Sequence, residues 1–139
     1  MVAGQVLDTV CHVEDEAGLT TLNRLKTGVM ISAAAELGCV AANMPIYWRQ
    51  QAVKFADQLG LAFQIRDDML DVMGDEAVFG KPIGSDKEEG KITYVNLKGL
   101  EGCAREVERC TAAAKEAIRD IPDHDFLWEL ADRMVGRDK

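Results

Sequence analysis

Apolar residues recur at helical spacing through most of the chain, beginning at its first residues. Val2, Val6 and Val10 lie four residues apart, beside Ala3 and Leu7. This period is that of one face of a helix, and no N-cap residue precedes it. The pattern therefore predicts a first helix, either one that begins further upstream or one that is uncapped and frayed at its start.

Two longer helices are predicted next. After an acidic connector, Thr20 or Thr21 can cap a second helix that runs to about Ala42. The Asn43-Met44-Pro45 segment then breaks this helix, because proline disfavours helical backbone in the residue before it and fits the first turn of the next helix. The third helix should run to about Met73 and, at ~1.5 Å per residue, would be roughly 40 Å long.

The second half of the chain combines one long loop with two further helices. Residues 74–92 hold four glycines, a proline and many charges, which predicts a long loop that a bound ligand orders. Helices over residues 101–121 and 123–135 follow, with Pro122 between them. The sequence thus predicts an all-α protein of about five helices, in a single domain over residues 1–139.

Composition supports a helical domain and excludes some functions. The chain has 3 prolines, 6% aromatic residues and 47% hydrophobic residues, which suits a helical fold with one core. Its net charge of -8 opposes the capture of nucleic acid or of an anionic membrane. The most apolar stretch, residues 28–44, is interrupted by Glu36 and is too short for a membrane span.

The cysteines carry no recognisable metal motif. Cys11, Cys39, Cys103 and Cys110 form no CxxC pair and have no histidine nearby at zinc-ligand spacing. Free thiols fit a reducing compartment, and the first residues lack the basic segment that is typical of a secretory signal. We therefore expect a soluble cytoplasmic protein that binds no nucleic acid.

A polar stripe interrupts the apolar third helix. At 100° per residue, Asp71 lies about 40° round the helix from Asp67, and Gln64 lies about 60° away on the other side. Two carboxylates one turn apart repel each other, so their place on an apolar helix calls for a cation. Magnesium suits such a site, because it takes a few carboxylate oxygens and completes its shell with water and phosphate. A solvated acidic face explains the same pattern without a metal.

Basic residues elsewhere could hold an anion beside that cation. Lys26 precedes Thr27 and Gly28 within the second helix, where a lysine flanked by apolar residues and a glycine is unusual. Lys81 and Lys91 lie beside glycines in the segment after the acidic helix. Each lysine alone is explained by surface exposure, but the ordered set favours a site for a metal-bound diphosphate.

These motifs, in this order, resemble the polyprenyl synthetases of the farnesyl and geranylgeranyl diphosphate synthase type. The resemblance rests on KTG at 26–28, GLAFQIRDDMLD at 60–71 and FGKPIGSDKEEGKITY at 79–94. GQVLD at 4–8 and LADRMVGRDK at 130–139 extend it over essentially the whole chain. The match is to the C-terminal half of these enzymes and implies a part of the isoprenoid synthase helical bundle.

The resemblance also implies a set of metal and diphosphate ligands. In the family, two aspartate-rich motifs face each other across a cavity, and three magnesium ions bridge them through the allylic diphosphate. Here Asp67 matches the main ligand of one ion, while Asp68 and Asp71 match residues that order its waters, supported by Gln64. The residues that match the holders of the leaving diphosphate are Lys26, Lys81 and Lys91.

The implied reaction joins an allylic diphosphate to isopentenyl diphosphate. The allylic diphosphate ionises, the double bond of isopentenyl diphosphate attacks the carbocation, and a proton is lost. The groups that match those stabilising the cation are Thr27, Gln64 and the carbonyl of Lys26. Phe63 matches a residue that borders the pocket, and Gln5 and Asp8 match residues beside the metal cluster.

The chain departs from the family in one large respect and one small one. The first aspartate-rich motif and the basic residues that hold isopentenyl diphosphate are absent from the sequence, so we expect the chain alone to be inactive without a missing N-terminal half. Val95-Asn96 follows Tyr94 where many bacterial members have proline. An exposed half-cavity also favours association between copies of the chain.

Two other functions remain open. The chain could be a short helical protein that binds diphosphate or isoprenoids, or assembles with a partner, without catalysis. A related class I terpene cyclase or head-to-head condensing enzyme is a third alternative, but the lysine-bearing segment around Lys81 and Lys91 argues against it.

Overall fold

The described part of the chain is helical throughout its regular structure, as predicted. The computed structural model describes residues 1–10, 13–79 and 92–137, and within them it contains helices and no strand. The elements in chain order are α1 (Val2–Val10), α2 (Glu16–Asn23), the π-helix η1 (Arg24–Gly28), α3 (Val29–Ala41), α4 (Ile46–Phe79), α5 (Tyr94–Ile118) and α6 (Asp125–Val135). Because α2, η1 and α3 follow one another without a break, the described residues form five helical rods, the number that the sequence predicts.

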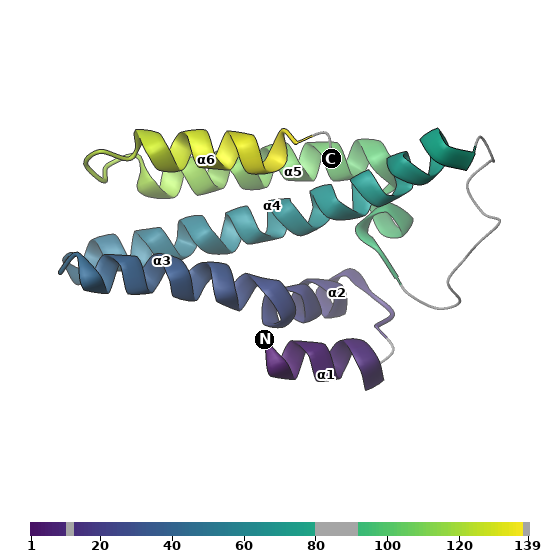
Figure 1. The fold of residues 1–139 in the computed structure, drawn as a ribbon, viewed down its shortest axis with the longest axis horizontal. Helices are drawn as coiled ribbons and strands as arrows, with labels where there is room; N and C mark the ends of the chain where they lie inside the picture. The colour runs from purple at the N-terminus through teal and green to yellow at the C-terminus, as the bar shows by residue number, and fades with distance from the viewer. Residues whose placement is uncertain (11–12, 80–91, 138–139) are drawn as a thin grey trace.

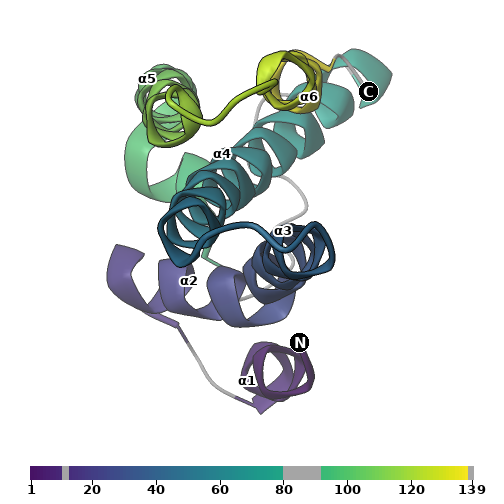
Figure 2. The same cartoon turned by 90° about the vertical axis from the view of Figure 1, so that its left-hand side faces the viewer.

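The rods are stacked in layers around α4. Figure 1 shows α4 running through the middle of the molecule, with α5 and α6 on one side and α3 on the other. The view at right angles shows α1 beyond α2 and α3, so that it is the outermost layer (Figure 2). The only rod that α1 contacts closely among the described residues is the one that contains α2 and η1. One side of α4 therefore faces the rod that carries η1.

Two buried clusters fix the rotation of α4 about its axis. Ile65 and Met69 of α4 belong to one cluster, and Phe55 and Leu59 belong to the other. Their buried partners from other elements are Leu19, Tyr94, Cys103 and Val107 in the first cluster, and Ala114, Ile118, Ile121 and Ala131 in the second. Burying a large apolar side chain such as Leu59 or Ile65 stabilises the fold by roughly 1.5–3 kcal/mol. The polar stripe of α4 is thereby held away from the core.

The prediction of the start of the second rod was wrong. We expected Thr20 or Thr21 to cap it, whereas α2 begins at Glu16 with Asp15 as its N-cap. The carboxylate of Asp15 accepts a hydrogen bond of 2.7 Å from the backbone N–H of Gly18, which is the contact that a good N-cap makes. The acidic residues read as a connector are thus the helix start itself.

The predicted loop over residues 74–92 also needs correction at both ends. Helix α4 continues to Phe79, and a side chain at Gly74 would meet open space, so nothing at this glycine forces the helix to end. Helix α5 begins at Tyr94 rather than near residue 101, because Thr93 and Asn96 form a capping box. Gly99, with φ 67°, marks a kink inside α5. The middle of the predicted loop lies outside the described residues.

The remaining helix ends lie within about three residues of their predicted positions. No helix in the described ranges has the length and apolar character that crossing a membrane requires.

Candidate functional site

The polar stripe of α4 lies on the side of the helix that the core leaves free. Gln64 and Asp67 are half-buried, and Asp71 is exposed. Their neighbour Ile65 is fully buried in the core, which sets the direction in which the stripe faces. The i, i+4 spacing of the two aspartates brings their carboxylates to adjacent turns of one face.

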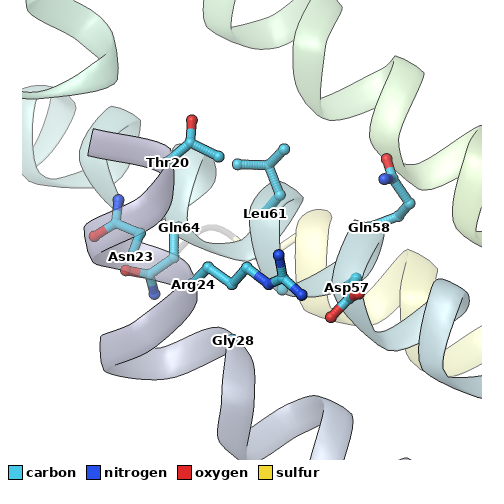
Figure 3. Close-up of a pocket in the computed structure, with 9 residues that line it drawn as sticks. Thr20, Asn23, Arg24, Gly28, Asp57, Gln58, Leu61 and Gln64 are labelled. Carbon is cyan, nitrogen blue, oxygen red and sulfur yellow. The ribbon is translucent and has the colours of Figure 1, made fainter. Parts of the chain in front are cut away.

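A pocket of about 210 Å³ separates the first turns of the second rod from α4. Its lining residues are Thr20, Asn23, Arg24, Gly28, Asp57, Gln58, Gly60, Leu61 and Gln64. In Figure 3, the guanidinium of Arg24 extends along the pocket toward Asp57. Sequence reasoning identified Gln64 but missed Arg24 and Asp57. The signal for Asp57 was present, because it lies seven residues, or about two turns, before Gln64 and therefore on the same helix face.

Asp67 already holds a cationic partner from the far end of the chain. Nη2 of Arg137, which follows α6, forms an ion pair with Oδ1 of Asp67. The guanidinium of Arg137 also lies 4.2 Å from the centroid of the Phe63 ring, a favourable cation–π distance. Nη2 of Arg66 donates to the carbonyl of Arg137 at 2.9 Å. The Asp67 carboxylate therefore faces a place where a positive charge can sit.

Lys26 forms a second ion pair, across the contact between η1 and α1. Its Nζ donates to Oδ2 of Asp8 at 2.7 Å, with side-chain exposed fractions of 37% and 15%. This contact depends on a close approach of α1 to η1, because a Cβ at the buried Gly4 would lie 2.2 Å from the backbone nitrogen of Lys26. In the same two elements, Thr27 is half-buried and Gln5 is exposed.

Asp68 contacts a different element from Asp67. Its Oδ2 accepts a hydrogen bond of 2.7 Å from the backbone N–H of Tyr94, the first residue of α5. Burial raises the pKa of the Asp68 carboxyl above its usual value, the Tyr94 hydrogen bond opposes that rise, and the nearby charge of Asp71 adds to it. Asp68 thus contacts the start of α5, while Asp67 contacts the end of the chain.

The structure brings the predicted site residues together in two groups. Gln64, Asp67, Asp71 and Phe63 share α4, whereas Gln5, Asp8, Lys26 and Thr27 share the α1–η1 contact. The described ion pairs hold the two groups separately, through Arg137 and Asp8 respectively. Lys81 and Lys91 lie outside the described residues.

The donor set fits a magnesium ion that shares its coordination with a ligand. In the part of the chain that the structure describes, no three metal-ligating side chains form a cluster. A closed all-protein site is therefore not available from these residues. Magnesium is commonly bound by one or two carboxylates together with substrate phosphates and water. Asp67 and Asp71 supply such a pair, and the Asp67 carboxylate already faces a cation.

Comparisons with known proteins identify the family. A model of the polyprenyl synthetase family matches residues 1–125. The farnesyl diphosphate synthase of Escherichia coli (strain K12) is 36% identical over 152 residues, which cover 100% of this chain and 49% of the relative. That of Geobacillus stearothermophilus is 37% identical and is matched over 99% of this chain and 48% of the relative. The chain belongs to the polyprenyl synthetase family.

Solved structures agree with the fold. The FPP/GFPP synthase of Zymomonas mobilis superposes with a TM-score of 0.81 at 28% identity, covering 97% of this chain and 45% of that one. The decaprenyl diphosphate synthase of Rhodobacter capsulatus superposes with a TM-score of 0.76 at 25% identity, covering 99% of this chain and 56% of that one. The chain spans about half the length of the relatives that it matches.

Proposed function

We propose that this chain forms one wall of the active-site cavity of a trans-prenyl diphosphate synthase, the wall that carries the second aspartate-rich motif. Such an enzyme joins an allylic diphosphate to isopentenyl diphosphate. The observation that carries the proposal is the position of Asp67, which lies in the segment that the family model matches and pairs with a cation, Arg137. A carboxylate in that situation can exchange one cation for another. Because the side chains of Asp67 and Arg137 are both partly exposed, a metal ion from solvent can reach the carboxylate.

The acidic residues would bind the metal, and the lysines would bind the diphosphate. Asp67 and Asp71 would hold Mg²⁺ together with the diphosphate, and Gln64 would orient the group from the adjacent pocket. Bound magnesium supplies Lewis acidity that stabilises the negative charge developing on the leaving diphosphate. Lys26, Lys81 and Lys91 would add positive charge around the outer oxygens of the same anion.

The remaining site residues would shape the space where the carbocation forms. Thr27, Gln64 and the carbonyl of Lys26 would present oxygen atoms to the cation. Phe63 would border its pocket with an aromatic face. Asp8 would hold Lys26 in place from α1, a role that the 2.7 Å contact between the two supports. Gln5, on the same helix, would lie beside the metal cluster.

We propose that the chain alone does not catalyse condensation, because the sequence contains a single DDxxD motif. The opposite wall would come from an N-terminal half on another chain or from a longer form of this one. Exposed apolar side chains on the outer rods support such a partner: Val2, Val6 and Val10 on α1 are 74%, 52% and 70% exposed, and Met30, Leu37 and Val40 on α3 are 56%, 66% and 47% exposed. Association between two copies of this chain could cover the same surface.

Two measurements test the proposal. The first is a chain-elongation assay of the purified chain, with and without an added N-terminal half of a related enzyme. We expect turnover only in the mixture, and robust turnover by the single chain would refute the requirement for two walls. The second is a calorimetric titration with Mg²⁺ and inorganic diphosphate. Asp67→Ala should abolish this binding, while Glu108→Ala, which removes an exposed acid from α5, should preserve it.

A second candidate is a binding protein without catalysis. It is favoured by the half-length match to the relatives. The two candidates differ in one result. A protein of the second kind would bind Mg²⁺ and diphosphate but would give no turnover with any added N-terminal half.

A further inference from the structure

Asp68 contacts the backbone of another helix. Its carboxylate accepts the backbone N–H of Tyr94 at 2.7 Å, at the first residue of α5. The amides of a first helical turn have no partner within their own helix, so an acceptor oxygen there satisfies a donor that would otherwise be unpaired. The bond spans 26 residues of sequence and links α4 directly to the start of α5.

Tyr94, whose backbone N–H Asp68 accepts, contacts two other helices. Tyr94 is 1% exposed and packs in the same cluster as Ile65 and Met69 of α4. Its hydroxyl lies 3.0 Å from Oγ1 of Thr20 in α2, within hydrogen-bond distance. Tyr94 therefore joins α5 to α4 and to the rod that contains α2, and Asp68 holds the backbone of Tyr94 at this contact.

Helix geometry gives this anchor a consequence for the metal site. Asp68 lies about 100° round α4 from Asp67 and about 60° from Asp71. When Asp68 is held against α5, the other two carboxylates are turned toward the free side of the helix. A slip of Asp68 toward the metal side would leave the N–H of Tyr94 without its acceptor, next to a buried cluster, which is costly.

We propose that Asp68 is a positioning residue, which ties α4 to the first residue of α5 and leaves metal coordination to Asp67 and Asp71. This inference rests on the proposed function, but it gives the three aspartates of one motif two different roles. It predicts that the oxygen of Asp68 matters and that its charge does not.

Asparagine is the variant that separates these properties. Asp68→Asn keeps an oxygen that accepts the Tyr94 N–H and removes the charge, whereas Asp68→Ala removes both. Amide hydrogen exchange at Tyr94, measured by NMR on the full 139-residue chain, reports the anchor directly. We expect exchange to accelerate by roughly tenfold or more in Asp68→Ala and to stay within about threefold of wild type in Asp68→Asn. Asp71→Asn is the matched control and should leave Tyr94 unchanged.

Titration with Mn²⁺ and inorganic diphosphate then tests the assignment of ligands. Asp68→Asn should bind within about threefold of wild type, and Asp67→Asn should bind at least about tenfold more weakly. Equal weakening in both variants, with Tyr94 still protected, would make Asp68 a ligand and overturn the inference. So would wild-type exchange rates in Asp68→Ala, or loss of folding in Asp68→Asn.

The two proposals fail in different ways. If the wild-type chain binds neither Mn²⁺ nor diphosphate, the proposed function fails in this chain, and the exchange of the Tyr94 amide still decides whether Asp68 is an anchor. If Asp68→Ala does not fold while Asp68→Asn does, the need for an acceptor oxygen at this position is supported.

Discussion

Replacing Arg137 with glutamine removes the cation that holds Asp67. The pair is partly exposed, with side-chain exposed fractions of 28% for Arg137 and 38% for Asp67, so solvent weakens it and we assign it about 0.2–1 kcal/mol. The contact with the Phe63 ring at 4.2 Å adds about 0.5–1 kcal/mol. A divalent ion that enters at Asp67 must displace both contacts, which together amount to about 1–2 kcal/mol.

This competition predicts tighter metal binding in the variant. Because each 1.4 kcal/mol corresponds to about a factor of ten, Arg137→Gln should bind Mn²⁺ roughly 5- to 30-fold more tightly than wild type in the absence of diphosphate. The free Mn²⁺ remaining in a titration of the full chain, followed by electron paramagnetic resonance, measures this change.

A nearby arginine provides the control. Arg133 lies in the last turn of α6, is well exposed and pairs with Glu129, so Arg133→Gln changes the net charge by the same amount without touching Asp67. Its Mn²⁺ affinity should differ from wild type by less than about twofold. Combining Arg137→Gln with Asp67→Asn should abolish the gain. An Arg137→Gln chain that binds Mn²⁺ no better than the Arg133→Gln chain would refute the competition.

Two further predictions concern stability. Gly4→Ala should lower the free energy of unfolding by about 1–3 kcal/mol by forcing α1 off η1, whereas Gly38→Ala, where a Cβ meets nothing within 4 Å, should raise it by about 0.5–1 kcal/mol; urea titrations of both variants check the pair. Burial raises the pKa values of Tyr94, Cys103 and Cys110 above their usual range. Acids with a raised pKa in the folded state stabilise it below their unfolded pKa, and this contribution is lost as pH rises. The urea midpoint should therefore fall above about pH 9, and less steeply in a Cys103→Ala, Cys110→Ala double variant; equal slopes would contradict this cause.

Local patterns determined the helices of this protein. The 3.6-residue period and the break at Pro45 predicted the rods within a few residues in most places, because both act through neighbouring positions in the chain. The starts of α2 and α5 were missed, since the capping oxygens of Asp15 and Thr93 extended each helix into segments that the sequence pattern assigned to connectors.

The sequence by itself also determined the family and the face of α4 that carries Gln64, Asp67 and Asp71, since the motif order and the helical repeat are both properties of the linear chain. Only the tertiary structure decided what each aspartate contacts. Asp67 and Arg137 are far apart in sequence, as are Asp68 and Tyr94, and both pairs meet because the buried clusters fix how α4 packs against α5 and α6. Contacts of this kind depend on the packing of whole helices, and no local spacing encodes them.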